Sequence, residues 1–130
     1  MVADIDIALL VEKLCRYDSE TEWIEFKVNN SNPEMIGQRI IALANSACRL
    51  DISTAYMVWG VDDETHEVVG SSFCYRLERR GNEELKNWLH HQLTDNASFE
   101  FAEDEVGGKH ITVLEVQAAF HHTVDFEGVP

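Results

Sequence analysis

The sequence predicts an α+β domain, in which three helices pack on a mostly antiparallel or mixed sheet of about five strands. Apolar residues recur at helical spacing in three segments, and they alternate or run unbroken in the segments between them. Polar or glycine-containing turns separate neighbouring strand segments, at Asp62-Asp63-Glu64-Thr65 and at Gly107-Gly108. Together these patterns favour helices packed against a sheet that contains hairpins.

Helices are expected over residues 4–16, 33–49 and 82–93. The second has the clearest start, because Asn32 can cap it and Pro33 takes the first helical position. The third is predicted to be capped by Asn82, with Glu83 and Glu84 in its first turn, where the helix dipole favours acidic groups.

Strands are expected near residues 22–28, 55–61, 67–70, 98–106 and 110–117. In the first, alternation directs Ile24 and Phe26 to a core and places Glu25 and Lys27 on the opposite face. The second contains no charged residue and is predicted to be a central strand covered on both faces, with the third returning antiparallel beside it.

The bulk composition describes a single globular domain over residues 1–130, with 45% hydrophobic residues and a net charge of −14. No apolar run approaches the ~20 residues that span a bilayer, and the acidic start lacks the basic region of a signal peptide. A cytoplasmic protein is therefore predicted. Cys15, Cys48 and Cys74 are odd in number and form no CxxC pair, so buried reduced thiols are expected and a zinc site is disfavoured.

The acidic charge disfavours nucleic-acid binding, which depends on neutralising phosphates. The densest basic group is Arg76, Arg79, Arg80 and Lys86, which supplies the candidate phosphate contacts. Glutamates are interspersed through this segment, so a solvated face of mixed charge is the competing interpretation.

Glu25 and Lys27 form the other candidate site. Successive residues on one face of a strand are ~6.6 Å apart, so both side chains can act on one group. A carboxylate beside an ammonium can hold a metal or polarise a phosphate, and an ordinary surface salt bridge is the alternative.

Four pieces in this order resemble the Schlafen AlbA-like domain, found in bacterial transcriptional regulators and RecG-related helicases. They are Glu20 with Glu25-Phe26-Lys27, then Ile41-Ala42-Leu43-Ala44-Asn45-Ser46, then Gly60-Val61-Asp62-Asp63, and Val68-Val69-Gly70. The resemblance covers residues 18–74 well. It implies a DNA-binding regulatory module of a larger bacterial protein, and the missing Walker motif argues against ATP.

The resemblance also implies two alternatives. One is a Mg²⁺- or Mn²⁺-dependent endoribonuclease, with Glu20, Glu25 and Asp63 as metal ligands and catalytic groups and Lys27 beside them; Asp62 is the second choice for the aspartate. The other is a protein-interaction module, including a homodimer formed through an open sheet edge. DNA, RNA and protein partners all stay open, and a membrane partner is not expected.

The chain departs from the family pattern at two places. The glycine pair expected after the Asn45-Ser46 helix end is replaced by residues 47–52, a longer connection without glycine. The chain also stops at Pro130, before a further strand that family members carry. An amino-terminal fragment with an open sheet edge is therefore expected.

Overall fold

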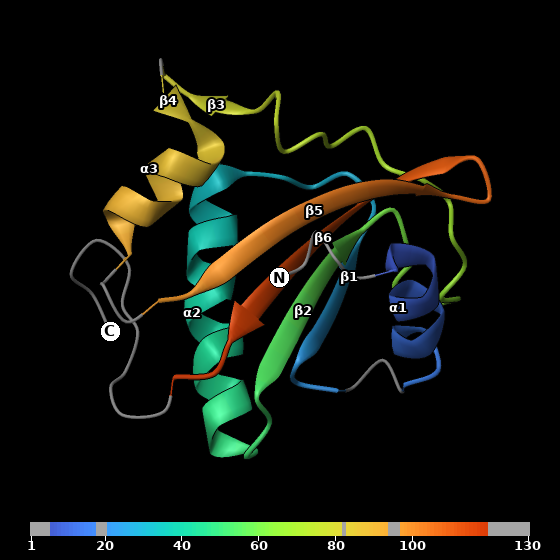
Figure 1. Ribbon diagram of the computed structural model, residues 1–130, viewed down its shortest axis with the longest axis horizontal. Helices are drawn as coiled ribbons and strands as arrows, with labels where there is room; N and C mark the ends of the chain where they lie inside the picture. The colour runs from blue at the N-terminus through green and yellow to red at the C-terminus, as the bar shows by residue number, and fades with distance from the viewer. Residues whose placement is uncertain (1–5, 18–20, 82, 94–96, 120–130) are drawn as a thin grey trace.

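The computed structural model describes residues 6–17, 21–81, 83–93 and 97–119, and it confirms the α+β class. In chain order the elements are α1 (Ile7–Leu14), β1 (Ile24–Lys27), α2 (Pro33–Arg49), β2 (Thr54–Trp59), β3 (Arg79–Arg80), β4 (Glu83–Glu84), α3 (Leu85–Gln92), β5 (Phe99–Val106) and β6 (Lys109–Gln117). A four-stranded mixed sheet has the order β1-β2-β6-β5, and β3 pairs with β4 separately. Figure 1 shows the larger sheet between α1 and α2.

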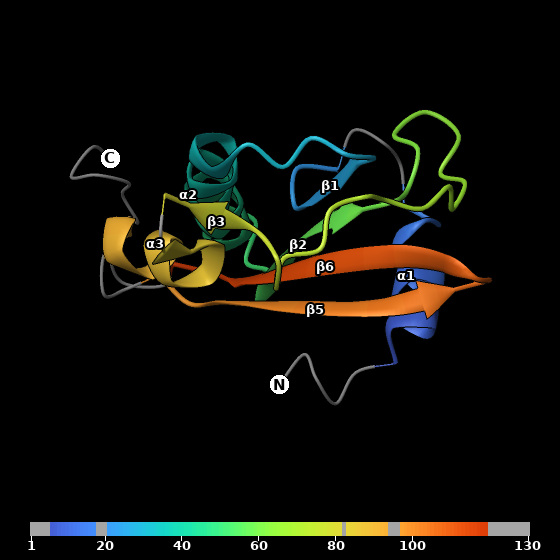
Figure 2. The same ribbon diagram turned by 90° about the horizontal axis from the view of Figure 1, so that it is seen from above.

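The sheet is mixed because β1 and β2 are parallel, with α2 as the crossover between them, whereas β2, β6 and β5 pair antiparallel. β1 and β5 are consequently the two edge strands. The predicted final hairpin is confirmed, and both turn residues, Gly107 and Gly108, have the positive φ that a tight hairpin turn of this type requires. Figure 2 shows β5 and β6 running side by side along the molecule.

The predicted strand at 67–70 is wrong. Only an isolated bridge joins Val61 to Val68 in this region. The backbone N–H groups of Val69 and Gly70 both donate to the carbonyl of Gly60, at 2.8 and 2.9 Å, so the chain bends instead of continuing a ladder. The larger sheet therefore has one strand fewer than expected.

Each face of the sheet has its own apolar core. Ala55, Met57 and Trp59 of β2 face α2 and α3, in a cluster that also contains residues of β5 and β6. On the other face Ile24 and Phe26 of β1 pack with the buried residues of α1. The predicted inward direction of Ile24 and Phe26 is confirmed, and so is the coverage of β2 on both faces.

The helix ends test the capping predictions. Asn32 caps α2, because its side-chain oxygen accepts from the N–H of Met35 at 3.0 Å, and Pro33 follows as expected. The expected start of α3 is wrong: Glu83 and Glu84 form β4, which pairs with the two arginines of β3, and the helix begins at Leu85. Opposite charges face each other across that short ribbon, which favours pairing over a first helical turn. The predicted cap, Asn82, lies outside the described residues.

An aspartate makes the turn that follows α2. α2 runs to Arg49, and Asp51 then adopts a φ of 59°, so the chain turns sharply and the N–H of Ile52 donates to the carbonyl of Ala47 at 2.8 Å. Aspartate tolerates this left-handed conformation better than most residues. The turn is thus kept without a glycine.

Gly60 lies where three backbone segments meet. Its N–H donates to the carbonyl of Lys27 at 2.7 Å, and its φ is +110°. A Cβ placed on it would lie 3.0 Å from the carbonyl oxygen of His110 and 3.3 Å from the backbone of Gly70. Both the conformation and the space therefore require glycine.

The cysteines are half-buried and unpaired rather than fully buried, and none forms a disulfide. Within the described ranges, the structure contains no helix with the length and apolar character of a membrane span.

Candidate site at the edge of the sheet

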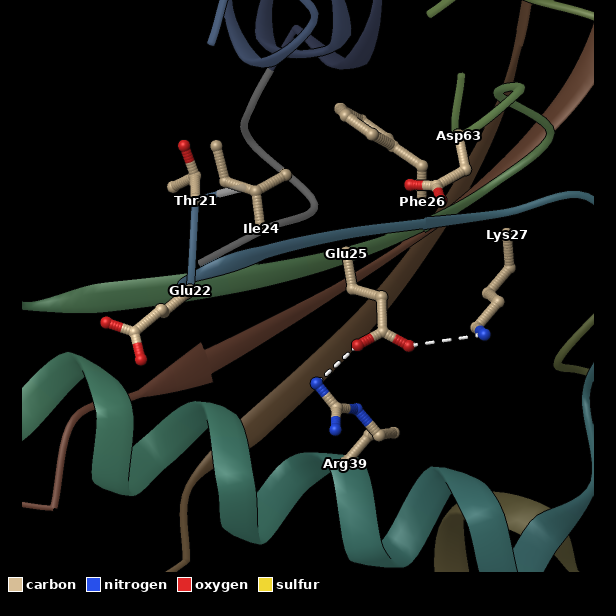
Figure 3. A pocket seen from close by; sticks show the side chains of 8 residues that line it. All are labelled: Thr21, Glu22, Ile24, Glu25, Phe26, Lys27, Arg39 and Asp63. Carbon is tan, nitrogen blue, oxygen red and sulfur yellow. Dashed lines mark ion pairs between the residues drawn. The ribbon is translucent and has the colours of Figure 1, made fainter. Parts of the chain in front are cut away.

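A pocket of about 340 Å³ lies along the edge strand β1, with α2 and the turn after β2 as its other walls. Its lining residues are Thr21, Glu22, Ile24, Glu25, Phe26, Lys27, Arg39 and Asp63. Figure 3 shows Glu25 directed toward Arg39 on α2, whereas Ile24 and Phe26 point to the other side of the strand. We call this cavity the β1-edge pocket.

Glu25 is the central charged group of the β1-edge pocket. One of its carboxylate oxygens pairs with Nη2 of Arg39, and the other lies 3.5 Å from Nζ of Lys27. The Glu25 side chain is 19% exposed, so these two cations compensate a largely buried negative charge. The prediction that Glu25 and Lys27 share a face and approach one group is confirmed.

Arg39 was missed by the sequence reasoning. It follows α2 residues that are buried in the core, and the helix directs its side chain at β1 instead of at solvent. Its Nε is buried and has no hydrogen-bond partner. One signal in the sequence was its spacing: Arg39 lies three residues after Ile36 and four before Leu43, both buried, which places it beside the apolar face of the helix.

The two adjacent aspartates have different tasks. Oδ1 of Asp62 accepts from the N–H groups of Glu64 and Thr65, both at 2.9 Å, and these hydrogen bonds lower the pKa of Asp62. Asp62 therefore closes the turn. Asp63 lines the β1-edge pocket, and no described residue forms a hydrogen bond or ion pair with it.

Asp63 and Glu25 reach the pocket from opposite sides of β1. Figure 3 shows Asp63 on the side of Phe26, and Glu25 on the side of α2. They line one cavity because β1 has no neighbouring strand on this side, so the pocket reaches both faces around its edge.

A second pocket of about 440 Å³ adjoins the first, and the two share Phe26, Lys27 and Asp63. It is also lined by Asp62 and Glu64 of the turn. Lys27 and Asp63 therefore lie at the junction of two hollows, which together follow β1 toward the turn after β2.

The metal ligands implied by the resemblance are only partly within the described residues. Glu25 and Asp63 offer the carboxylate oxygens that Mg²⁺ and Mn²⁺ prefer, whereas Glu20 lies outside the described ranges. Both oxygens of Glu25 already contact cations, so a metal ion would compete with Arg39 and Lys27. Among the residues described, no third ligand joins this pair in a compact cluster.

The basic group predicted to contact nucleic acid comes from the loop before β3, from β3 itself and from α3. Arg80 pairs with Glu34 at 2.6 Å and lies over the ring of Trp88. Arg76 and Lys86 each lie 3.6 Å from a glutamate of β5, Glu103 and Glu100 respectively. Arg79 is exposed on β3. This arrangement is a surface of mixed charge, and whether it contacts nucleic acid stays a prediction.

The family comparison agrees with the sequence motifs. The family described as Schlafen, AlbA_2 matches residues 20–129, which confirms the resemblance. Among solved structures, the DIP2311 protein from Corynebacterium diphtheriae is similar, with 14% identity and a TM-score of 0.49. The match covers 94% of this chain and 24% of that one, so this chain spans about a quarter of its length. At that score the likeness carries no argument. No curated protein matches the chain.

Proposed function

We propose that this chain, which belongs to the Schlafen AlbA_2 family, is a DNA- or RNA-binding regulatory module that holds a backbone phosphate in the β1-edge pocket. At the coarse level, membership makes it a nucleic-acid-related, AlbA-like module. We propose in addition that it binds nucleic acid, that this binding is regulatory, and that the ligand is DNA or RNA.

The observation that supports it most is the meeting of Lys27 and Arg39 in one pocket. One guanidinium nitrogen of Arg39 pairs with Glu25, and the side chain is still 39% exposed. A phosphate oxygen in the pocket would accept from the exposed part of the guanidinium, and charge-assisted hydrogen bonds of this kind are among the stronger ones. Lys27 would add a second cation from the neighbouring strand position.

The net charge of −14 sets the strength of this binding. Phosphate is repelled by the acidic surface as a whole, so affinity should be modest and should fall steeply as salt is added. The two cations offset the charge of Glu25, but Glu22 and Asp63 also line the pocket, so its lining as a whole is not positive.

Fluorescence anisotropy with single-stranded RNA, single-stranded DNA and duplex DNA at low salt tests the proposal. Arg39→Ala is expected to weaken binding about tenfold, the equivalent of one lost charge-assisted contact. Arg16→Ala is the matched control, because it removes the same charge from an exposed pair with Glu12 on α1. Equal affinity of these two variants for nucleic acid would contradict binding in the β1-edge pocket. A greater loss of affinity in an Arg79→Ala, Arg80→Ala variant would place the interface at β3.

A metal-dependent nuclease is the second candidate, and Asp63 is the observation that favours it. Its carboxylate lines the same pocket as Glu25, where no described residue pairs with it. With Mn²⁺ present, cleavage of an RNA oligonucleotide is expected to be lost in Asp63→Asn. Asp62→Asn is the control at the neighbouring position, since Asp62 serves the turn. Absence of Mn²⁺-dependent cleavage by the unmodified chain would remove this candidate.

β1 and β5 are the edge strands of the sheet, so either could pair with the same strand of a second copy in the predicted homodimer. It stays a prediction, and sedimentation velocity over a range of concentrations would test it.

A further inference from the structure

A cysteine, a histidine and a glutamate from three segments converge on one point, on the side of the sheet distant in strand order from β1. Sγ of Cys74 lies 3.7 Å from Nε2 of His110, and Oε2 of Glu103 lies 3.1 Å from the same nitrogen. One ligand atom from each residue lies within 4.8 Å of the other two, and all three residues are half-buried.

The register of the β5–β6 hairpin brings two of these residues together. Glu103 is paired directly with Thr112, and His110 is two positions from Thr112 on the same strand. Cross-strand partners share a face, and so do residues two apart, so Glu103 and His110 project from one side as diagonal neighbours.

The third residue is delivered by the loop before β3. The N–H of Ser71 donates to the carbonyl of His110 at 2.9 Å, and Oγ1 of Thr112 donates to the carbonyl of Phe73 at 2.8 Å. These two hydrogen bonds fix the loop across the hairpin face. Cys74, directly after Phe73, is consequently held against the imidazole.

The spacing matches that of ligands around a tetrahedral ion. Zn–S bonds of about 2.3 Å and Zn–N or Zn–O bonds of about 2.0–2.1 Å place sulfur and nitrogen about 3.6 Å apart, and nitrogen and oxygen about 3.3 Å apart. The separations of 3.7 and 3.1 Å in this cluster are close to both values.

The carboxylate of Glu103 gives a further indication. Its side chain is 12% exposed; Oε1 lies 3.6 Å from Nε of Arg76, whereas the buried Oε2, which faces His110, forms no hydrogen bond. An unsatisfied buried carboxylate oxygen is costly, and a bound cation would satisfy it.

We propose that Cys74, Glu103 and His110 bind a divalent transition-metal ion of the zinc class. One thiolate, one imidazole and one carboxylate suit Zn²⁺ and do not suit Mg²⁺ or Ca²⁺, which prefer oxygen ligands throughout. Three protein ligands leave the fourth position to water or to an added ligand. The ion ties the loop after β2 to the β5–β6 hairpin, and its binding releases the thiol proton of Cys74.

A catalytic triad of the same three residues does not fit. A nucleophile and an acid that activate a histidine use its two different ring nitrogens. Here both Cys74 and Glu103 approach Nε2, as ligands around one ion do. Nε2 also lies 3.1 Å from the carbonyl oxygen of Phe73 and 3.2 Å from Oγ1 of Thr112, and a bound ion would replace these contacts.

Cobalt is the probe that reports the thiolate directly. The whole chain, freed of metal by chelator and reduced, is titrated with Co²⁺ and followed by absorbance. We expect a thiolate-to-cobalt charge-transfer band that saturates at one equivalent, accompanied by the visible bands of a four-coordinate ion, and displacement of both by Zn²⁺.

Three variants decide the result. Cys74→Ser is expected to lose the charge-transfer band, whereas Cys48→Ser, which changes another half-buried free thiol, should keep it. Glu103→Gln should weaken cobalt affinity by at least tenfold, because one of the three protein ligands loses its negative charge. Far-ultraviolet circular dichroism checks that each variant folds.

A second measurement does not depend on any variant. Zinc is expected to protect one of the three thiols of the unmodified chain from a thiol reagent, and peptide mapping should identify it as Cys74. No charge-transfer band, a band that survives in Cys74→Ser, or protection of Cys15 or Cys48 instead would overturn the proposal. The test uses no nucleic acid, so it is independent of the proposed function.

Discussion

The β1-edge pocket and the Cys74–Glu103–His110 cluster each place a largely buried glutamate beside cationic or ligating groups, yet the two glutamates are satisfied differently. In the pocket, the oxygens of Glu25 face Arg39 and Lys27. In the cluster, Oε1 of Glu103 lies 3.6 Å from Nε of the exposed Arg76, whereas the buried Oε2 faces the imidazole of His110 and has no hydrogen bond. Both oxygens of Glu25 are therefore paired with cations, whereas one oxygen of Glu103 is not.

The function of a buried carboxylate therefore depends mainly on the groups that surround it. A carboxylate held by an arginine and a lysine is well suited to positioning those cations for an anion, and it resists giving them up to a metal. A carboxylate beside a thiol and an imidazole is suited to a metal, because all three are ligands that zinc accepts. Residue type alone predicts neither outcome.

The largest effect is expected for a substitution of Gly60, which would disturb both sites at once. Gly60→Ala should destabilise the fold by about 3 kcal/mol, from the cost of a positive φ and from crowding against a packed backbone. Gly60 N–H is bound to the carbonyl of Lys27, and a Cβ would crowd the carbonyl of His110, so both regions depend on it. Urea denaturation measures the loss, and both nucleic-acid and cobalt binding should weaken with it.

Gly81→Ala is the matched control for this substitution. Gly81 also has a positive φ, +66°, but a Cβ there would meet nothing within 4 Å. It should therefore cost only the conformational part, about 1 kcal/mol. Equal losses in the two variants would mean that crowding at Gly60 contributes nothing.

Much of this fold could be predicted because its signals are local. The cap Asn32-Pro33, the alternation around Glu25 and the turn Gly107-Gly108 each act over a few residues, and each is confirmed. The strand expected at 67–70 failed because the bend around Gly60 depends on a close approach of β6, which no local pattern reveals.

Zinc binding at the Cys74–Glu103–His110 cluster should stabilise the fold. Zinc at one hundred times its dissociation constant should stabilise the folded chain by about 2.7 kcal/mol, because it binds the folded state and the unfolded chain poorly. In a chain of this size that corresponds to a rise in Tm of roughly 10 °C. Differential scanning fluorimetry with and without zinc measures it.

Glu103→Gln should reduce this rise strongly, and Glu100→Gln should not. Glu100 lies on the same strand and its side chain is 52% exposed, so it matches the change in charge without touching the cluster. A zinc-dependent rise that is equal in both variants would show that the ion binds elsewhere.

The two sites also differ in how far the sequence could reveal them. Glu25 and Lys27 are two residues apart on one strand, so their proximity follows from strand geometry. Cys74, Glu103 and His110 meet only because a loop crosses a hairpin, so the cysteine spacing that argued against zinc contained no information about them. Arg39 is an intermediate case, since its helix was predicted and the direction of its side chain was not.

The strength of the ion pair between Glu25 and Arg39 in the β1-edge pocket can be measured as a coupling energy. A double-mutant cycle with Glu25→Gln and Arg39→Met should give a coupling of about 1 kcal/mol, because the pair is only partly shielded from solvent. The corresponding cycle for Glu22 and Arg49, an exposed pair between the same two regions, should give less than half of that. Equal couplings would show that burial of Glu25 adds nothing to the pair.

The smallest effect separates the two adjacent aspartates beside the β1-edge pocket. Hydrogen bonds from the N–H groups of Thr65 and Glu64 hold the pKa of Asp62 below its usual value of 3.8. A carboxyl group whose pKa is lowered in the folded state stabilises that state above the unfolded pKa, and the contribution disappears as the pH falls through the folded value. Asp62→Ala should therefore lower the Tm slightly at neutral pH, and the difference from the unmodified chain should shrink below pH 3.8.

Asp63→Ala provides the comparison, since Asp63 lines the β1-edge pocket and pairs with no described residue. Its Tm at neutral pH should match that of the unmodified chain, while its effect on Mn²⁺ binding should be the larger of the two. Thermal melts of both variants from pH 7 to pH 3 would test this. If Asp63→Ala lowered the neutral-pH Tm and Asp62→Ala did not, Asp63 would be the residue that holds the turn, and it could not be counted as an unpaired carboxylate among the described residues of the β1-edge pocket.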